Sequence, residues 1–174
     1  MNISNLEQLN SEREKRLKQI LSHRPRISVG MGTCGIGNGA DEVYKELEKS
    51  LHRKKAGISL GKVGCFGFCA DEPLVNIYMP GKPLIILSKV KPKDAAKIVE
   101  KTMKGDIYKE RVLCKIEEWD HITGKVIYGR GFPGVPNWNE VPFFRGQKKI
   151  VLRDCGLIDP ENIDDYIAVG GYQS

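Results

Sequence analysis

The feature that most constrains this fold is a fixed order of strand-like and helix-like patterns within residues 26–105. Four short apolar runs have the length and composition of strands, and they cover residues 26–29, 58–63, 74–79 and 84–88. Helical patterns occupy residues 40–53 and 91–105. A loop with five glycines in ten residues separates the first strand from the first helix. The sequence PGKP between the last two strands predicts a hairpin turn.

The predicted order is therefore β-α-β, then a β-hairpin, then α. Because a helix joins the first two strands, we expect those strands to be parallel. This order is that of a thioredoxin-like α/β fold, written βαβ-ββα.

The predicted domain carries an extension at each end. Residues 3–22 have helical periodicity, and Pro25 prevents the helix from continuing. Beyond Gly105 the sequence predicts short strands and turns, then two short helices, the first ending at Gly156 and the second starting at Asp159-Pro160. We therefore predict three parts: an N-terminal helix (1–25), a thioredoxin-like domain (26–105), and a linker that begins a further region (106–174).

Composition narrows the function classes. The formal charge of +6 comes from lysines and arginines that are mixed with acidic residues along the chain. Mixed-sign runs are typical of solvated helix faces, so we expect no nucleic-acid partner. The longest aliphatic run, LIIL at 84–87, is too short to cross a membrane, and the polar N-terminus does not resemble a signal peptide. We therefore expect a cytoplasmic protein without direct membrane insertion.

Three cysteines are candidate metal ligands. Cys34 follows the first predicted strand, and Cys65 and Cys69 follow the second, in the segment KVGCFGFCADEP. Parallel strands end at one edge of a sheet, so the three side chains should converge there. Thiolates favour soft metals and iron–sulfur clusters, and the count of five cysteines in a reducing compartment argues against a disulfide framework. Small buried hydrophobes are the alternative role for these three residues.

The remaining candidate groups are weaker. Cys114, in a strand-like segment, and Cys155, before a glycine, are expected to be structural. The histidines lie in charged surroundings away from the cysteine loops, at positions 23, 52 and 121, so a zinc site with one histidine requires an unexpected fold. A disulfide reductase role lacks the C-x-x-C motif at a helix start.

The segment GMGTCG (30–35) also matches the dinucleotide fingerprint G-x-G-x-x-G between a strand and a helix. The fingerprint is normally followed, about twenty residues on, by an acidic residue. This chain instead has HRKKAG there, at 52–57. The predicted domain also has too few strands for a full dinucleotide-binding fold, so this interpretation is the weaker one.

Three segments together resemble one family: VGMGTCGIGNGADEV (29–43), GCFGFCADEPLVNI (64–77) and PFFRGQKKIVLRDCGLIDPENIDDYIAVGGY (142–172). They are similar to the start of the NADH- and flavin-binding subunit of complex I and its relatives. Those relatives include NAD(P)-reducing and electron-bifurcating hydrogenases and NAD-dependent formate dehydrogenases. The resemblance implies a thioredoxin-like [2Fe-2S] domain, a linker, and then the start of a flavin- and NADH-binding region.

The chain departs from that family in its first cysteine loop. The resemblance implies a C-x4-C pair there and a C-x3-C pair in the second loop. The second pair is present as Cys65 and Cys69, whereas the expected first-loop positions are Gly30 and Gly35, with Cys34 one residue away. We therefore expect Cys34, Cys65 and Cys69 to hold the cluster with a fourth ligand of another kind. The alternative is that the fold has lost its cluster.

The resemblance implies an electron-transfer module of an NADH-linked multi-subunit oxidoreductase, of the NADH dehydrogenase or NAD(P)-reducing hydrogenase type. Its partners would be the other subunits of such a complex, with self-association as a further possibility. The glycine-rich flavin and NADH loops would come later in the family sequence, so we expect FMN and NAD(H) to bind outside these residues. The alternative function is a cluster-free docking module for subunit assembly.

Overall fold

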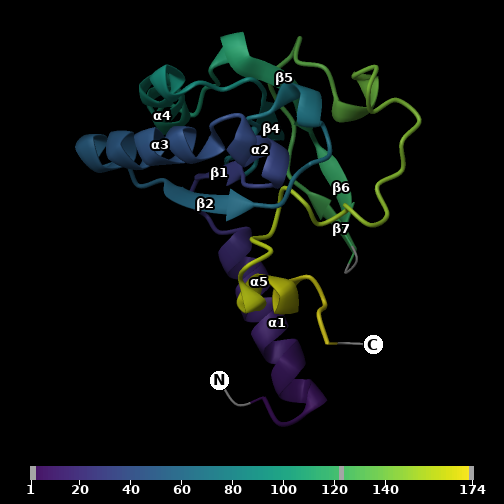
Figure 1. The fold of residues 1–174 in the computed structure, drawn as a ribbon. Coiled ribbons are helices and arrows are strands. Elements are labelled where there is room, and N and C mark those ends of the chain that lie inside the picture. Colours follow the sequence, from purple (N-terminus) through teal and green to yellow (C-terminus); the bar gives the residue numbers. More distant parts are fainter. Residues whose placement is uncertain (1–2, 122–123, 173–174) are drawn as a thin grey trace.

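The computed structural model describes residues 3–121 and 124–172. Its centre is a five-stranded sheet in the order β2-β1-β3-β4-β5 (Figure 1). The strands are β1 (Arg26–Gly30), β2 (Ser59–Val63), β3 (Val75–Tyr78), β4 (Leu84–Leu87) and β5 (Val112–Ile116). β1 is parallel to β2 and antiparallel to β3, and β4 is antiparallel to both β3 and β5. The expected βαβ-ββα order and the α/β fold class are confirmed.

Two helices cover one face of the sheet. α3 (Ala40–Lys54) and α4 (Ala95–Met103) lie next to each other on that face, and the 3-10 turn η2 (Pro92–Asp94) leads into α4 (Figure 1). α3 directs Val43, Leu47 and Leu51 into the core, because residues four apart share one side of a helix.

The opposite face of the sheet is covered by residues beyond α4. They form the hairpin β6 (Glu118–His121) and β7 (Gly124–Ile127), the 3-10 turn η4 (Trp138–Glu140), and a run of turns up to residue 157. The 3-10 turn η3 (Lys109–Arg111) instead lies on the α4 side, where Arg111 pairs with Asp94. The sheet has an apolar core on each face, and β4 contributes to both because successive side chains of a strand point to opposite faces. Ile85 packs on the α3–α4 side, and Ile86 packs among aromatic residues on the other side. Trp119 Nε1 donates a 2.6 Å hydrogen bond to the carbonyl oxygen of Arg153 and so ties the turns to the hairpin.

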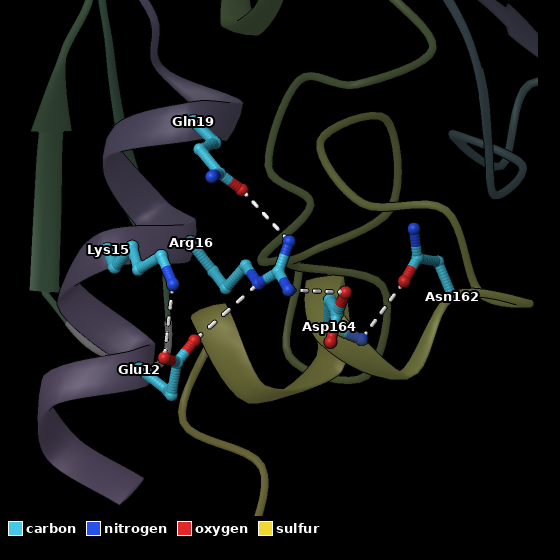
Figure 2. A network of polar contacts seen from close by, with 6 residues as sticks. All are labelled: Glu12, Lys15, Arg16, Gln19, Asn162 and Asp164. Atoms are coloured by element: carbon cyan, nitrogen blue, oxygen red, sulfur yellow. Dashed lines mark hydrogen bonds and ion pairs between the residues drawn. The ribbon is translucent and has the colours of Figure 1, made fainter. Parts of the chain in front are cut away.

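The N-terminal helix packs against the end of the described chain. α1 (Leu6–Ile20) lies beside α5 (Ile163–Ala168), away from the α3–α4 layer (Figure 1). Arg16 Nη2 lies 2.9 Å from Asp164 Oδ2 and joins the two helices, as Figure 2 shows. Ile20, Leu157 and Ala168 form a small separate core at this junction. None of the helices in residues 3–121 and 124–172 is long and apolar enough to cross a membrane.

Three local predictions are wrong. The glycine-rich loop contains a short helix, α2 (Thr33–Gly37). The helix expected to end at Gly156 is a series of turns, and Gly156 itself has a φ of 87°. α5 starts at Ile163 rather than at Asp159-Pro160, because the Asn162 side chain caps it by accepting a hydrogen bond from the Asp164 N–H. In addition, β5 joins the main sheet from a segment assigned to the linker; the division into three parts itself stays a prediction.

Candidate functional site

The three predicted cysteines lie at the edge of the sheet where the parallel strands β1 and β2 end. Cys34 is in α2, which begins three residues after β1. Cys65 lies two residues beyond β2, and Cys69 begins the 3-10 turn η1 (Cys69–Asp71). The Cβ position on Gly32 would be 2.8 Å from the Cys65 Cβ, so the two loops touch. The topology therefore brings the loops together as expected, and the role of the cysteines as ligands stays a prediction.

The thiols of Cys34 and Cys69 form one pair. Both residues are exposed, and all five cysteines of the chain have free thiols. A side-chain hydrogen bond to Cys69 raises the pKa of Cys34. Two sulfur atoms from different loops are thus close to each other and open to solvent.

Cys65 forms the second pair with Glu72. The Cys65 Sγ is 3.5 Å from Glu72 Oε1, and the Gly67 N–H donates a 3.3 Å hydrogen bond to the same sulfur. Gly67 has a φ of 93°, a backbone conformation that favours glycine and directs its N–H toward the sulfur. Burial raises the pKa of Cys65 to about 11.

Glu72 is a functional candidate that the sequence analysis did not identify. Glu72 is only 5% exposed, and its Oε2 accepts a 2.6 Å hydrogen bond from the Leu74 N–H. Burial raises the pKa of Glu72, and no lysine or arginine among the described residues contributes an opposing shift. The available signal was a glutamate three residues after Cys69, within the same loop.

Glu72 faces the two glycines that stand at the family's cysteine positions. A Cβ on Gly30 would lie 3.6 Å from Glu72 Oε2, and a Cβ on Gly35 would lie 3.3 Å from the same atom. A Cβ on Gly35 would also lie 2.5 Å from the carbonyl oxygen of Gly30, which is closer than a real side chain allows. The carboxylate therefore lies next to both positions, and α2 as folded excludes a cysteine at position 35.

These donors fit one kind of metal group better than another. Among the residues that the structure describes, no three histidine, cysteine, aspartate or glutamate side chains come close enough together to hold a metal ion. The donors form two pairs instead, Cys34 with Cys69 and Cys65 with Glu72. In a [2Fe-2S] cluster each of the two irons takes two protein ligands. The three thiols fit such a cluster in type, and with the carboxylate the set matches it in number.

The other two cysteines lie outside these pairs. Cys114 is fully buried opposite Ile86 in the sheet, and burial raises its pKa to about 12. Cys155 packs on Gly64, where a Cβ would be 3.3 Å from its sulfur. Burial raises the pKa of Cys155, and the charged groups that act on it are Asp154 and Lys149.

The two histidines whose side chains the structure describes do not join the site. His52 lies in the last turn of α3, and His23 follows α1. The side chain of His121 lies outside the described part of the structure.

Lys149 is a second residue that the sequence analysis missed. Its Nζ donates a 3.1 Å hydrogen bond to the Phe66 carbonyl oxygen and lies 5.3 Å from the centre of the Phe66 ring. It anchors the covering turns to the cysteine loop and places a positive charge near the sulfur of Cys65.

Curated proteins similar to this chain include two hydrogenase subunits. No known family profile matches the chain. The NADP-reducing hydrogenase subunit HndB of Solidesulfovibrio fructosivorans is 27% identical over 108 residues, which are 60% of this chain and 86% of HndB. Subunit HndC of the same organism is 63% identical over 27 residues, which are 16% of this chain and 6% of HndC.

Solved structures with a similar fold include the wild-type thioredoxin-like [2Fe-2S] ferredoxin from Aquifex aeolicus. It has a TM-score of 0.47 and 22% identity, and the match covers 54% of this chain and all of the ferredoxin. A second structure of that ferredoxin gives a TM-score of 0.46 at 22% identity, and covers 54% of this chain and 94% of the ferredoxin.

Proposed function

Because the chain is related to subunits of NADP-reducing hydrogenases and has a thioredoxin-like fold, we propose that it is an electron-transfer module of a multi-subunit, NAD(P)-linked oxidoreductase. In this proposal Cys34, Cys65 and Cys69 hold a [2Fe-2S] cluster at the shared end of β1 and β2. The observation that carries the proposal is the gathering of these cysteines, from separate loops, at one edge of the sheet.

A bound cluster would supply one-electron transfer between neighbouring redox groups. The residues of this chain would set its environment. The Gly67 N–H directed at the Cys65 sulfur stabilises negative charge there, and such hydrogen bonds raise the reduction potential of iron–sulfur centres. Cys34 and Cys69 are exposed, so this side of the site is open to a partner.

The proposed partners are other subunits of the complex. HndB and HndC are named as subunits of one NADP-reducing hydrogenase, and this chain has similarity to both. In this proposal, flavin and NAD(P) chemistry takes place outside residues 1–174, and the cytoplasm supplies the reducing conditions that keep the five thiols free.

The test is a comparison of cysteine variants after anaerobic reconstitution with iron and sulfide. Wild-type protein is expected to show the visible absorption of a [2Fe-2S] cluster, and the double variant Cys65→Ser/Cys69→Ser to lose it. The matched control is Cys114→Ser, which removes a thiol outside the site and should retain the absorption. Equal absorption in the wild type and the double variant would contradict the proposal.

A second candidate function is a cluster-free docking module. It is favoured by the finding that no three potential ligands in the described residues are grouped as for a metal ion. Exposed apolar side chains on the covering turns, among them Val151 at 91% exposure, offer contact area for a partner. Assembly with the partner subunits that survives substitution of Cys34, Cys65 and Cys69 together would support this function.

A further inference from the structure

We propose that Glu72 supplies the fourth protein ligand of the cluster, through its carboxylate. The inference rests on the proposed function, because it concerns the same site. Three thiols leave one of the four ligand positions of a [2Fe-2S] cluster to be filled. The structure offers an oxygen donor at that point rather than a fourth sulfur.

The Glu72 carboxylate has the right position for a ligand. Glu72 Oε1 lies 3.5 Å from the Cys65 sulfur, so the carboxylate is already beside a predicted ligand. Its oxygens also lie within 3.7 Å of the point where a side chain on Gly30 would start, and Oε2 lies 3.3 Å from that point on Gly35. The carboxylate therefore lies beside both Cys65 and Gly35, the chain neighbour of Cys34.

The Glu72 carboxylate is also buried, with few groups to stabilise its charge. A buried carboxylate needs hydrogen bonds, a positive partner or a metal to offset its loss of hydration. The Leu74 N–H satisfies Oε2, whereas Oε1 has only the weak donor Cys65 Sγ–H beside it. No lysine or arginine in the described ranges forms an ion pair with Glu72; the neighbouring Asp71, by contrast, pairs with Lys89 at 3.1 Å. An iron ion would provide the missing positive partner while Oε2 keeps its hydrogen bond.

The described residues offer no better donor. Cys155 packs on Gly64, and the charged groups that act on it are Asp154 and Lys149 rather than Glu72. Cys114 is buried in the apolar core on β5, opposite Ile86. Among the described residues, Glu72 is the carboxylate that lies beside both Cys65 and the Cβ positions of Gly30 and Gly35.

The experiment compares the full chain with the variants Glu72→Gln, Glu72→Cys and Asp71→Asn after identical anaerobic reconstitution. Asp71→Asn is the matched control, because it removes a carboxylate from the adjacent position without touching the site. The readouts are iron and sulfide per chain, the EPR spectrum of the reduced state and the midpoint potential. The fold of each apoprotein is checked by circular dichroism.

Glu72→Gln preserves the shape and the Leu74 hydrogen bond but removes the anionic donor. We expect its retention of iron to fall by at least about 10-fold, because even indirect partners of metal ligands contribute that much. Glu72→Cys supplies a thiolate instead, and we expect a retained cluster with altered EPR g-values and a lower midpoint potential. Asp71→Asn should match the wild type in all three readouts.

Two results would overturn the inference and are distinguishable. If wild-type protein binds a cluster and Glu72→Gln binds it with unchanged iron, EPR spectrum and potential, Glu72 is not a ligand while the proposed function stands. If folded wild-type protein binds no iron at all, the proposed function fails and the inference fails with it.

Discussion

The sulfur of Cys65 and the carboxylate of Glu72 lie 3.5 Å apart, on a loop that follows β2. The two residues are held by separate backbone N–H groups, Cys65 by that of Gly67 and Glu72 by that of Leu74. This loop thus orients a soft donor and a hard donor toward each other without help from a third side chain. In the proposed cluster site, the Glu72 carboxylate would add a fourth donor to the three cysteine thiols.

Because α2 packs closely against β1, we expect that Gly35 cannot be replaced by a larger residue without loss of stability. Gly35→Ala would place a Cβ 2.5 Å from the Gly30 carbonyl oxygen, so backbone must shift. We expect a loss of about 1–3 kcal/mol in the free energy of unfolding, measured by urea denaturation. Gly37→Ala is the control, because no atom lies within 4 Å of its Cβ position. Equal stability of the two variants would show that α2 packs differently.

The ion pair between Asp94 and Arg111 predicts a large energetic effect. Asp94 is 3% exposed, and its Oδ2 lies 2.7 Å from Arg111 Nε, which connects η2 to η3. Arg111→Ala removes the positive partner and leaves the buried carboxylate with the Lys91 N–H and the Tyr108 hydroxyl. We expect a loss of about 3 kcal/mol in the free energy of unfolding.

The control is the exposed pair of Lys101 and Asp106, 2.8 Å apart. Lys101→Ala should lower the free energy of unfolding far less than Arg111→Ala does, because solvent screens exposed charges. Similar losses for Arg111→Ala and Lys101→Ala would contradict the burial argument.

The five thiols should react in an order set by exposure and pKa. Cys34 and Cys69 are exposed and should be alkylated first in the apoprotein. Cys114 is fully buried, with its pKa raised to about 12 by burial, so little thiolate exists at pH 8 and no path for reagent is open. Timed iodoacetamide labelling read by mass spectrometry should find Cys114 modified only in denaturant. Early labelling of Cys114 in folded protein would contradict its placement in the core.

The raised pKa of Asp165 should make the stability of the fold depend on pH. Burial raises its pKa; repulsion by Asp159 and Asp164 acts in the same direction, while the Asp159 N–H bond and Arg26 oppose the shift. Because the folded-state pKa is above the unfolded value near 4, stability from this group is present in acid and is lost as pH rises through the folded pKa.

Asp165→Asn removes this loss and keeps an oxygen that can accept the Asp159 N–H bond. We expect the variant to gain stability relative to wild type as the pH is raised from 4 to 7 in urea titrations. Glu161→Gln, an exposed change of the same charge on the same segment, is the control. A stability difference between wild type and Asp165→Asn that does not change with pH would refute the assignment.

The sequence predicted the elements whose signals are local and repeated. The apolar residues of α3 recur four apart, and the runs around PGKP have strand length, so these elements and their order were confirmed. The end of the parallel strands then placed all three cysteines at one edge. The site's location follows from topology alone.

The parts that the sequence did not predict depend on tertiary contacts. The turns before Gly156 are held by bonds such as Trp119 Nε1 to the Arg153 carbonyl oxygen, across 34 residues, and no local pattern encodes them. The role of Glu72 also depends on tertiary contacts. It is a ligand candidate because it is buried beside Gly30 and Gly35, which are distant in sequence. A glutamate before a proline gives no sign of this by itself.

The central claim is tested most directly by the iron and acid-labile sulfide content of anaerobically purified wild-type protein, together with EPR of the reduced state. We predict about two irons and two sulfides per chain and a [2Fe-2S] signal in the reduced protein. Folded protein that contains neither iron nor sulfide after reconstitution would contradict it.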